Sequence, residues 1–241
     1  MACFIDKVKF FDVAKLTTRM KMIIIPIGSC EQHGPHLPLG TDTIDCYEIA
    51  KRVSAKTGVP VIPPFAYGCS QSHGDFPGTL SIRPETMIRM ICDIVEWLYR
   101  SGIRKVLFLN GHNWNLGPIY SARENIRYDF PDLQVRVLDW FASSPQIAAQ
   151  IGNADANHSN IGETSCMLAV RPDLVNMANA VDEEDYKTFF EYSSRILGRE
   201  ATKATSEIGE NIIRIVVDNL ASMVEGALRE EIPFPSRSND R

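Results

Sequence analysis

The stretch MIIIPIGSCEQHGPHLPLGTD, residues 22–42, carries most of the information about the fold of this 241-residue chain. Its first part, residues 22–27, is apolar and rich in isoleucine, which predicts a strand buried on both faces. The rest is a polar loop of histidines, carboxylates, glycines and prolines. Residues 43–57 then predict a helix that ends at Gly58. A buried strand that leads through a loop into a helix indicates the beginning of a parallel α/β sheet.

The same alternation continues along the chain. Further strands are predicted at residues 59–62, 105–109 and 134–139. Pro60 favours an edge position for the first of these strands. Further helices are predicted at residues 84–101, 116–128, 162–170, 183–197 and 208–228. This pattern predicts an α/β fold with a mostly parallel sheet covered on both faces. We expect one domain over residues 1–241, with a loose polar tail at 233–241.

The composition limits the class of protein. Hydrophobic residues make up 44% and charged residues 23% of the chain, which excludes a disordered or collagen-like protein. The net charge of −5 would repel phosphate backbones, which argues against nucleic acid as a partner. The six cysteines form no CxxC pair, no signal-like leader is recognisable, and no apolar run is long enough to span a membrane. We therefore expect a cytoplasmic protein with reduced thiols and no membrane association.

Each predicted strand is followed by a polar segment. The four segments are residues 28–42, 67–79, 110–115 and 157–165. Because ligands bind where the carboxyl ends of parallel strands meet, we expect these segments to converge on one site. They contain all five histidines of the chain, namely His33, His36, His73, His112 and His158. One loop histidine is usually a surface residue, but five on one rim indicate a metal site or acid–base catalysis.

Two carboxylates and two histidines of these segments could bind metal ions. Glu31 and His33 are two residues apart, so both side chains can point to the same side of an extended segment. Asp42 ends the same loop, where it could alternatively cap the following helix. Together with His112 they form a mixed oxygen and nitrogen set that suits Zn²⁺, Mn²⁺ or Fe²⁺. A carboxylate such as Asp42 could bridge two ions, which could share a hydroxide and polarise a substrate carbonyl.

The segment GSCEQHGPHLPLGTD, residues 28–42, resembles the signature of the creatininase family, G-S-x-E-Q-H-G-P-H-L-P-L-x-T-D. The resemblance continues, in the order of the family, through residues 70–79, 110–112 and 158–165. The first of these stretches ends in FPGT and the second is NGH. The third begins with His158 and ends, after four intervening residues, with Glu163-Thr164-Ser165. The resemblance spans residues 22–165, and a fifteen-residue motif with so few variable positions is specific.

This resemblance implies a three-layer αβα sandwich with a binuclear metal centre that hydrolyses amide-type C–N bonds. Glu31 and His33 would bind different metal ions, and Asp42 would bridge them. His112 would complete the first site, and His158 would contact the substrate and assist proton transfer. The ions would be Zn²⁺ and/or Mn²⁺, with Fe²⁺ as an alternative. The substrate would be a small molecule such as a cyclic amide or a formamide, and the protein would be a homo-oligomer, by resemblance a hexamer.

One position departs from the pattern of the creatinine-hydrolysing members of the family. Trp114 stands where they have a glutamate that binds the second metal ion, and tryptophan cannot bind a metal. We expect Glu163 to replace that ligand and to take part in catalysis, although a carboxylate there could also simply favour the start of a helix. We also expect slow or absent turnover of creatinine, with Trp114 stacking on another flat substrate.

Other roles stay open at the level of the sequence. His73 and Ser70 are candidates for the substrate pocket, although a plain loop role fits His73 equally well. His36 is expected to pack beside the site, and Cys30 to be a small packed residue rather than a nucleophile. No G-x-S-x-G or G-x-G-x-x-G pattern supports a serine hydrolase or a dinucleotide site. The alternatives are a catalytically silent relative that binds a ligand, and a family hydrolase that acts on a sugar-like ring or a peptide.

Overall fold

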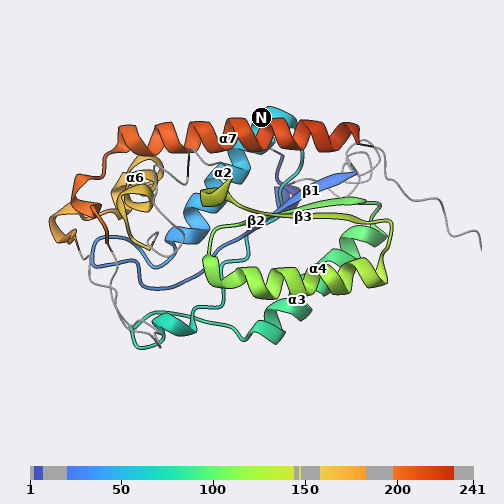
Figure 1. Ribbon diagram of the computed structural model, residues 1–241, viewed down its shortest axis with the longest axis horizontal. Helices are drawn as coiled ribbons and strands as arrows, with labels where there is room; N and C mark the ends of the chain where they lie inside the picture. Colours follow the sequence, from blue (N-terminus) through green and yellow to red (C-terminus); the bar gives the residue numbers. More distant parts are fainter. Residues whose placement is uncertain (1–2, 8–20, 144–146, 148–157, 183–197, 231–241) are drawn as a thin grey trace, which may run out of the picture.

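The protein is a parallel sheet between two layers of helices (Figure 1). A computed structural model describes residues 3–7, 21–143, 147, 158–182 and 198–230. The strands are β1 Met22–Ile27, β2 Lys105–Asn110 and β3 Gln134–Asp139, parallel and in the order β1-β2-β3. The helices are α2 Thr41–Thr57, α3 Pro84–Arg100, α4 Leu116–Asp129, α6 Ile161–Val170 and α7 Ser206–Arg229.

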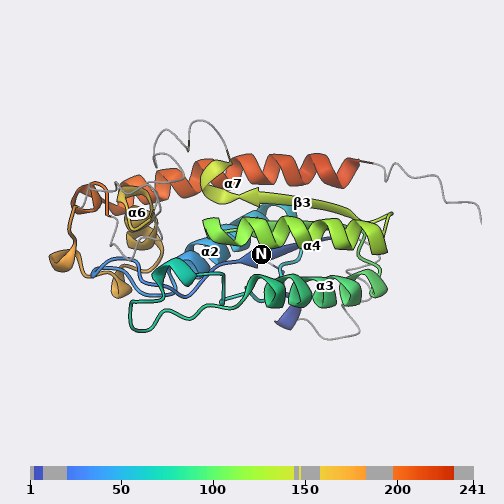
Figure 2. The ribbon, with the colours of Figure 1, turned by 60° about the horizontal axis from the view of Figure 1, so that its bottom comes forward.

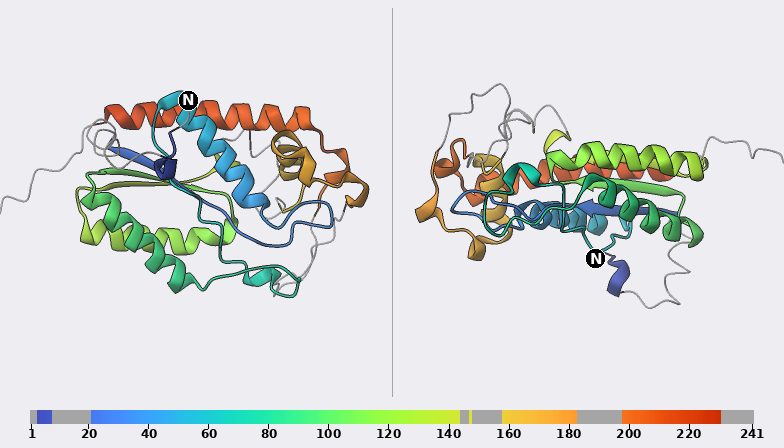
Figure 3. Two further views of the ribbon diagram at one scale, coloured as in Figure 1. Left: turned by 180° about the vertical axis from the view of Figure 1, so that it is seen from behind. Right: turned by 90° about the horizontal axis from the view of Figure 1, so that it is seen from below.

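β1 is buried on both faces because its side chains alternate between two hydrophobic cores. Ile23 and Ile25 pack with the apolar sides of α3 and α4, which run side by side on one face of the sheet (Figures 2 and 3). Ile24 packs on the opposite face with α2, α6 and α7. The αβα sandwich of three layers expected from the sequence is therefore confirmed.

The segment predicted as a strand at residues 59–62 forms only isolated bridges. Val61 pairs in parallel with Ile24 on the side of β1 away from β2, and on its other side it pairs with Phe4, whose neighbours Cys3 and Ile5 exchange hydrogen bonds with it. The predicted edge position is therefore wrong, because residues 3–5 cover that side of the segment. A longer ladder does not form, because Pro60 has no N–H to donate and Pro63 and Pro64 follow directly.

The helix starts differ from the predicted ones by at most two residues, and one difference matters for the site. α2 begins at Thr41, which places Asp42 in its first turn, and Gly40 is the N-cap. The alternative role of Asp42 as a helix cap is therefore wrong. The helix predicted at 183–197 and the tail at 233–241 lie outside the described residues. Among the helices of the described ranges, none is both long and apolar enough to cross a membrane.

Two glycines allow close approaches beside the candidate site, one between a loop and a helix and one between two helices. A Cβ atom at Gly111, just after β2, would lie 2.7 Å from the carbonyl oxygen of Asp42 on α2. A Cβ atom at Gly209 on α7 would lie 1.9 Å from the carbonyl oxygen of Ser165 on α6. Any side chain at these positions would push α2 or α6 outward, and both helices carry residues of the candidate site.

Candidate active site

The parallel strands end at one edge of the sheet, near α2 and α6 (Figure 1). The predicted site residues come together at this edge. Glu31 and His33 lie in the loop after β1, and His112 follows β2. Asp42 enters from the first turn of α2 and Glu163 from the first turn of α6. All five side chains are buried, although all five belong to loops or helix starts. Buried ionisable groups of this kind need partners or ions.

Asp42 is at the centre of the arrangement. Its Oδ1 lies 2.9 Å from Nε2 of His33, and its Oδ2 lies 3.0 Å from Nδ1 of His112. The hydroxyl of Ser29 also donates a hydrogen bond of 2.7 Å to Oδ2. Glu31 lies on the side of His112, with 3.3 Å between Oε1 and Nδ1. The two oxygens of one carboxylate therefore face two different imidazoles.

Backbone carbonyls fix the orientation of these two imidazoles. Nδ1 of His33 lies 3.1 Å from the carbonyl oxygen of Glu31, and Nε2 of His112 lies 3.1 Å from that of Cys69. A carbonyl only accepts hydrogen bonds, so these nitrogens carry the ring proton. The other nitrogen of each ring faces Asp42, which is the orientation found in metal-binding histidines.

Glu163 lies on the His33 side of Asp42. Its Oε2 is 3.9 Å from Nε2 of His33 and accepts a hydrogen bond of 2.6 Å from the backbone N–H of Ser159. The helix start is capped by Asn160, whose side chain accepts from the N–H groups of Gly162 and Glu163. Because the asparagine takes the capping role, the carboxylate of Glu163 is free to turn toward the site.

The electrostatics show an excess of buried negative charge. Burial alone would lower the pKa of His33, but Asp42, with Glu163 and Glu31, raises it to about 10. Burial likewise opposes the rise for His112, whose pKa Glu31 and Asp42 bring to about 9. Burial raises the pKa of Glu163 to about 8 against the pull of His33, and it raises the pKa of Glu31 as well. Without further cations, the three carboxylates must recruit protons onto the histidines.

The carboxylate of Glu31 provides a direct test of whether a metal ion fits. Both of its oxygens are buried, and neither makes a hydrogen bond. An ionised carboxylate left in this state is costly, whereas coordination to a divalent cation would satisfy both oxygens. Single ligand atoms of Glu31, Asp42 and His112 also lie within 4.8 Å of one another, as do those of His33, His158 and Glu163. The residues present therefore fit metal ions.

The residues predicted to contact substrate lie in different environments. His73 is buried and stacks on His158, with ring centroids 4.4 Å apart and 19° between the planes. Ser70 is fully buried, just before the short turn that contains His73. The side chain of Trp114 is 54% exposed, in the turn that follows His112. His36 is buried against Thr164, at 2.8 Å, as expected of a packing residue.

Two asparagines outside the predicted set of site residues connect the loops. Asn115 accepts a hydrogen bond from the N–H of Cys69 at 2.9 Å and donates one to the carbonyl of Gly28 at 3.0 Å. Asn110 donates to the carbonyl of His112 and to the carboxylate of Asp139 at the end of β3. Their position in the motif NGHNWN, directly after a buried strand, was the available signal.

An αβα sandwich with buried carboxylates and histidines at the carboxyl edge of its sheet is typical of hydrolytic enzymes. The family model Creatininase, described as creatinine amidohydrolase, matches residues 6–224. The chain belongs to the creatininase family, and it is an amidohydrolase of that family.

Individual relatives agree with this assignment. Creatinine amidohydrolase of Pseudomonas putida is 32% identical over 238 residues, which cover 88% of this chain and 90% of the relative. The mycofactocin precursor peptide peptidase of Mycolicibacterium smegmatis is 34% identical over 171 residues, 67% of this chain and 62% of the peptidase. Among solved structures, a mutant creatininase matches with a TM-score of 0.85 and 26% identity, over 95% of this chain and all of the other.

Proposed function

We propose that the protein hydrolyses a C–N bond in a small cyclic amide or formamide-type molecule and that it uses two divalent metal ions. The proposal rests above all on the position of Asp42, whose two oxygens face His33 and His112 at 2.9 and 3.0 Å. Glu31 adds an oxygen on one side and Glu163 on the other. A carboxylate placed between two such ligand sets suits a binuclear centre.

The two ligand sets share Asp42. Glu31 and His112 would complete the set for the first ion, and His33 and Glu163 the set for the second. Mixed oxygen and nitrogen ligands suit Zn²⁺ and Mn²⁺, with Fe²⁺ as the alternative. When bound, two such ions lower the pKa of a water molecule toward neutrality and polarise a substrate carbonyl.

His158 is our candidate for the residue that assists the leaving nitrogen. Its Nδ1 lies 3.5 Å from Oε1 of Glu31, so it borders the first ligand set. Its side chain is 15% exposed, more than those of His33, His73 and His112, which places it nearest to solvent. The leaving nitrogen must gain a proton because an amide anion is a poor leaving group, and a histidine is suited to that task.

Trp114, His73 and Ser70 would shape the substrate site. The exposed indole of Trp114 offers a flat apolar face beside His112, on which a planar ring could stack. Because this indole replaces a metal-binding glutamate of the creatinine-hydrolysing members, we propose that creatinine is turned over slowly or not at all. The names of the relatives point to creatinine and to a precursor peptide as substrates in the family.

A peptide or a sugar-like ring is therefore the alternative substrate, and a catalytically silent ligand-binding protein is the alternative function.

We further propose that residues 1–241 form a single domain and that the protein is a cytoplasmic homo-oligomer, a hexamer by analogy with the family. Light scattering that shows a monomer at micromolar concentration would contradict the assembly.

The decisive experiment combines metal analysis with a hydrolysis screen. The purified protein is loaded with Zn²⁺ or Mn²⁺ and assayed on creatinine, other cyclic amides, formamides and short peptides. We expect two ions per chain and turnover of a cyclic amide or formamide. Two bound ions without any hydrolysis would favour the silent relative, and a kcat for creatinine within the ordinary range of about 1–10³ s⁻¹ would refute the proposed specificity.

A further inference from the structure

Gln32 contacts two histidines of the site without belonging to either ligand set. Its side-chain nitrogen Nε2 is 2.8 Å from Nδ1 of His73 and 2.9 Å from Nε2 of His158. On the other side of these rings, Nε2 of His73 and Nδ1 of His158 face Oε1 of Glu31 at 3.7 and 3.5 Å. One buried amide therefore contacts both rings from the side opposite to the carboxylate.

The backbone of Gly34 decides which end of the Gln32 amide faces the rings. The N–H of Gly34 donates a hydrogen bond of 3.0 Å to Oε1, so the oxygen points to the backbone and the NH₂ group points to the histidines. An amide nitrogen can only donate, so the two ring nitrogens that it contacts must accept. The ring proton then lies on Nε2 of His73 and on Nδ1 of His158, the nitrogens that face Glu31.

We infer that Gln32 is a positioning residue that holds His73 and His158 as a pair of neutral N–H donors directed at the Glu31 side of the centre. The stacked rings present their acceptor nitrogens to the same amide, which allows one side chain to orient both. The inference rests on the proposed function, in which the N–H of His158 would supply the proton for the leaving nitrogen and the N–H of His73 would donate to a substrate oxygen.

The same hydrogen bonds remove a competing metal site. Glu31, His73 and His158 bring single ligand atoms within 4.8 Å of one another, which makes them a third possible metal-binding group. A protonated ring nitrogen has no lone pair to offer a metal ion, so the tautomers set by Gln32 exclude this group.

Two kinds of histidine thus surround the centre. His33 and His112 each direct one N–H to a backbone carbonyl, and their other nitrogen, which faces Asp42, would offer its lone pair to a bound ion. His73 and His158 do the reverse and direct their protons inward. The difference arises because the first pair is oriented by acceptors and the second by the donor of Gln32.

The variant Q32E tests this inference because it keeps the shape and the acceptor for Gly34 but replaces the donor with a second acceptor. The tautomers are read from ¹⁵N spectra of the Zn²⁺-loaded protein labelled only at histidine, with H73Q and H158Q to assign the signals. We expect the wild type to carry protons on Nε2 of His73 and Nδ1 of His158, and Q32E to reverse both. N211D makes the same chemical exchange on the exposed side of α7 and should leave the spectrum unchanged.

Metal content and kinetics provide a second readout. Q32E should bind additional Zn²⁺, because inward lone pairs complete the third group, and kcat should fall about 10- to 100-fold with a smaller change in KM. Q32M, which cannot reverse the tautomers by accepting protons, should lower kcat without binding extra metal. A wild-type spectrum with the proton on Nδ1 of His73 or on Nε2 of His158 would overturn the inference, even if Q32E does not fold. The spectra need no substrate, so they test the role of Gln32 separately from the proposed function. A protein without hydrolytic activity would refute the proposed function, while the tautomers of His73 and His158 would still decide the role of Gln32.

Discussion

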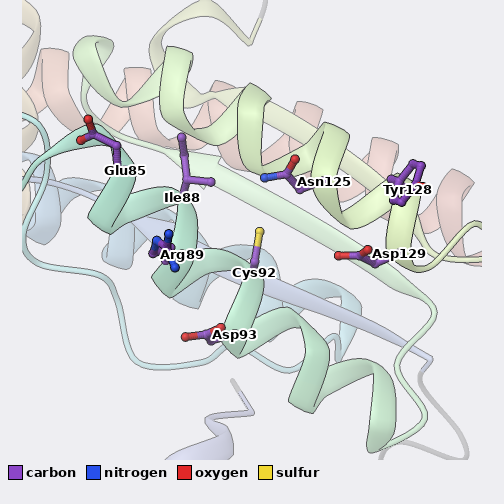
Figure 4. A pocket seen from close by; sticks show the side chains of 8 residues that line it. All are labelled: Glu85, Ile88, Arg89, Cys92, Asp93, Asn125, Tyr128 and Asp129. Carbon is purple, nitrogen blue, oxygen red and sulfur yellow. The ribbon is translucent and has the colours of Figure 1, made fainter.

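Both helical layers cover the sheet with buried hydrophobic residues, but within the described ranges only one of them contributes ionisable groups to the candidate site. α3 and α4 border a groove of about 470 Å³, whose lining includes the carboxylates of Glu85, Asp93 and Asp129 (Figure 4). These three residues are exposed. α2 and α6, on the other face, bury Asp42 and Glu163 in their first turns.

The glutamates in the first turns of α3 and α6 illustrate this difference between the two helical layers. Glu85 of α3 and Glu163 of α6 occupy similar positions in the sequence of their helices. Glu85 is exposed, whereas Glu163 is buried 3.9 Å from His33. A carboxylate near a helix start is favourable in either place because of the helix dipole, but only burial beside other ionisable groups gives it a chemical role.

The largest expected effect comes from replacing Asp42 with alanine, with the same replacement of Asp93 in the other helical layer as the control. D42A removes the carboxylate shared by both ligand sets, so both ions and all measurable turnover should be lost. D93A makes the same change in the groove between α3 and α4, where the carboxylate is exposed, and should leave both unchanged. Metal content and initial rates are measured on the same preparations. Full metal content with normal turnover in D42A would refute the proposed mechanism.

A second contrast lies within the site itself. H158A removes a side chain that we assign to the leaving nitrogen and not to a metal ion. We expect full metal content and a kcat lowered by about 10²- to 10⁴-fold, the usual contribution of a general acid or base. If H158A instead loses an ion, His158 is a ligand and its proposed role is wrong.

E163Q and E85Q compare the two first-turn glutamates directly. The amide of E163Q can still accept from Ser159 but is a poor metal ligand, so we expect one ion in place of two and a kcat lowered about 10- to 100-fold. E85Q should behave as the wild type. The double variant W114E/E163Q should regain the second ion if position 114 can supply the missing carboxylate. Unchanged metal content in E163Q would leave Glu163 with a structural role only.

The smallest expected effect concerns the stability of the metal-free protein at high pH. His33 and His112 have folded-state pKa values of about 10 and about 9, above the value of about 6.5 in an unfolded chain. The folded state then binds more protons than the unfolded state, so the stability that they contribute is lost as the pH rises from 7 toward 10. Glu163, with a pKa of about 8, acts in the same direction, but only up to about pH 8. Thermal unfolding of the EDTA-treated protein should show a Tm that falls as the pH rises, and the metal-bound protein should show a smaller fall. Equal pH profiles of Tm for the metal-free and the metal-bound protein would contradict this.

Much of the architecture follows from local patterns in the sequence. β1 and β2 are apolar runs bounded by polar loops, and Pro84 marks the start of α3, so residue type alone predicts these elements. The convergence of the histidine loops follows from parallel strands. The start of α2 depends on which N–H groups have partners, and a sequence does not show this. The pairing of Val61 with Phe4 depends on how the first residues of the chain dock, which local patterns do not show either.

The hydrogen-bonding partners inside the site were beyond prediction for the same reason. Gln32 contacts His158 across 126 positions of the chain, and both hydrogen bonds require the finished arrangement of three loops. Nothing in the composition of the motif EQHG says that the glutamine amide points its nitrogen toward two rings. Only the fixed position of Gly34 settles it.

The buried side chain of Asn115 has a consequence for the order of folding. Its partners, Gly28 and Cys69, precede it by 87 and 46 residues, so its hydrogen bonds close long loops and cannot form before both segments have docked on β2. Side-chain bonds that close such loops belong to the last steps on the way to the native state. The centre that they organise should therefore be absent from the folding transition state. Ions bound there would then lengthen the lifetime of the native protein by slowing its unfolding and leave the rate of folding nearly unchanged.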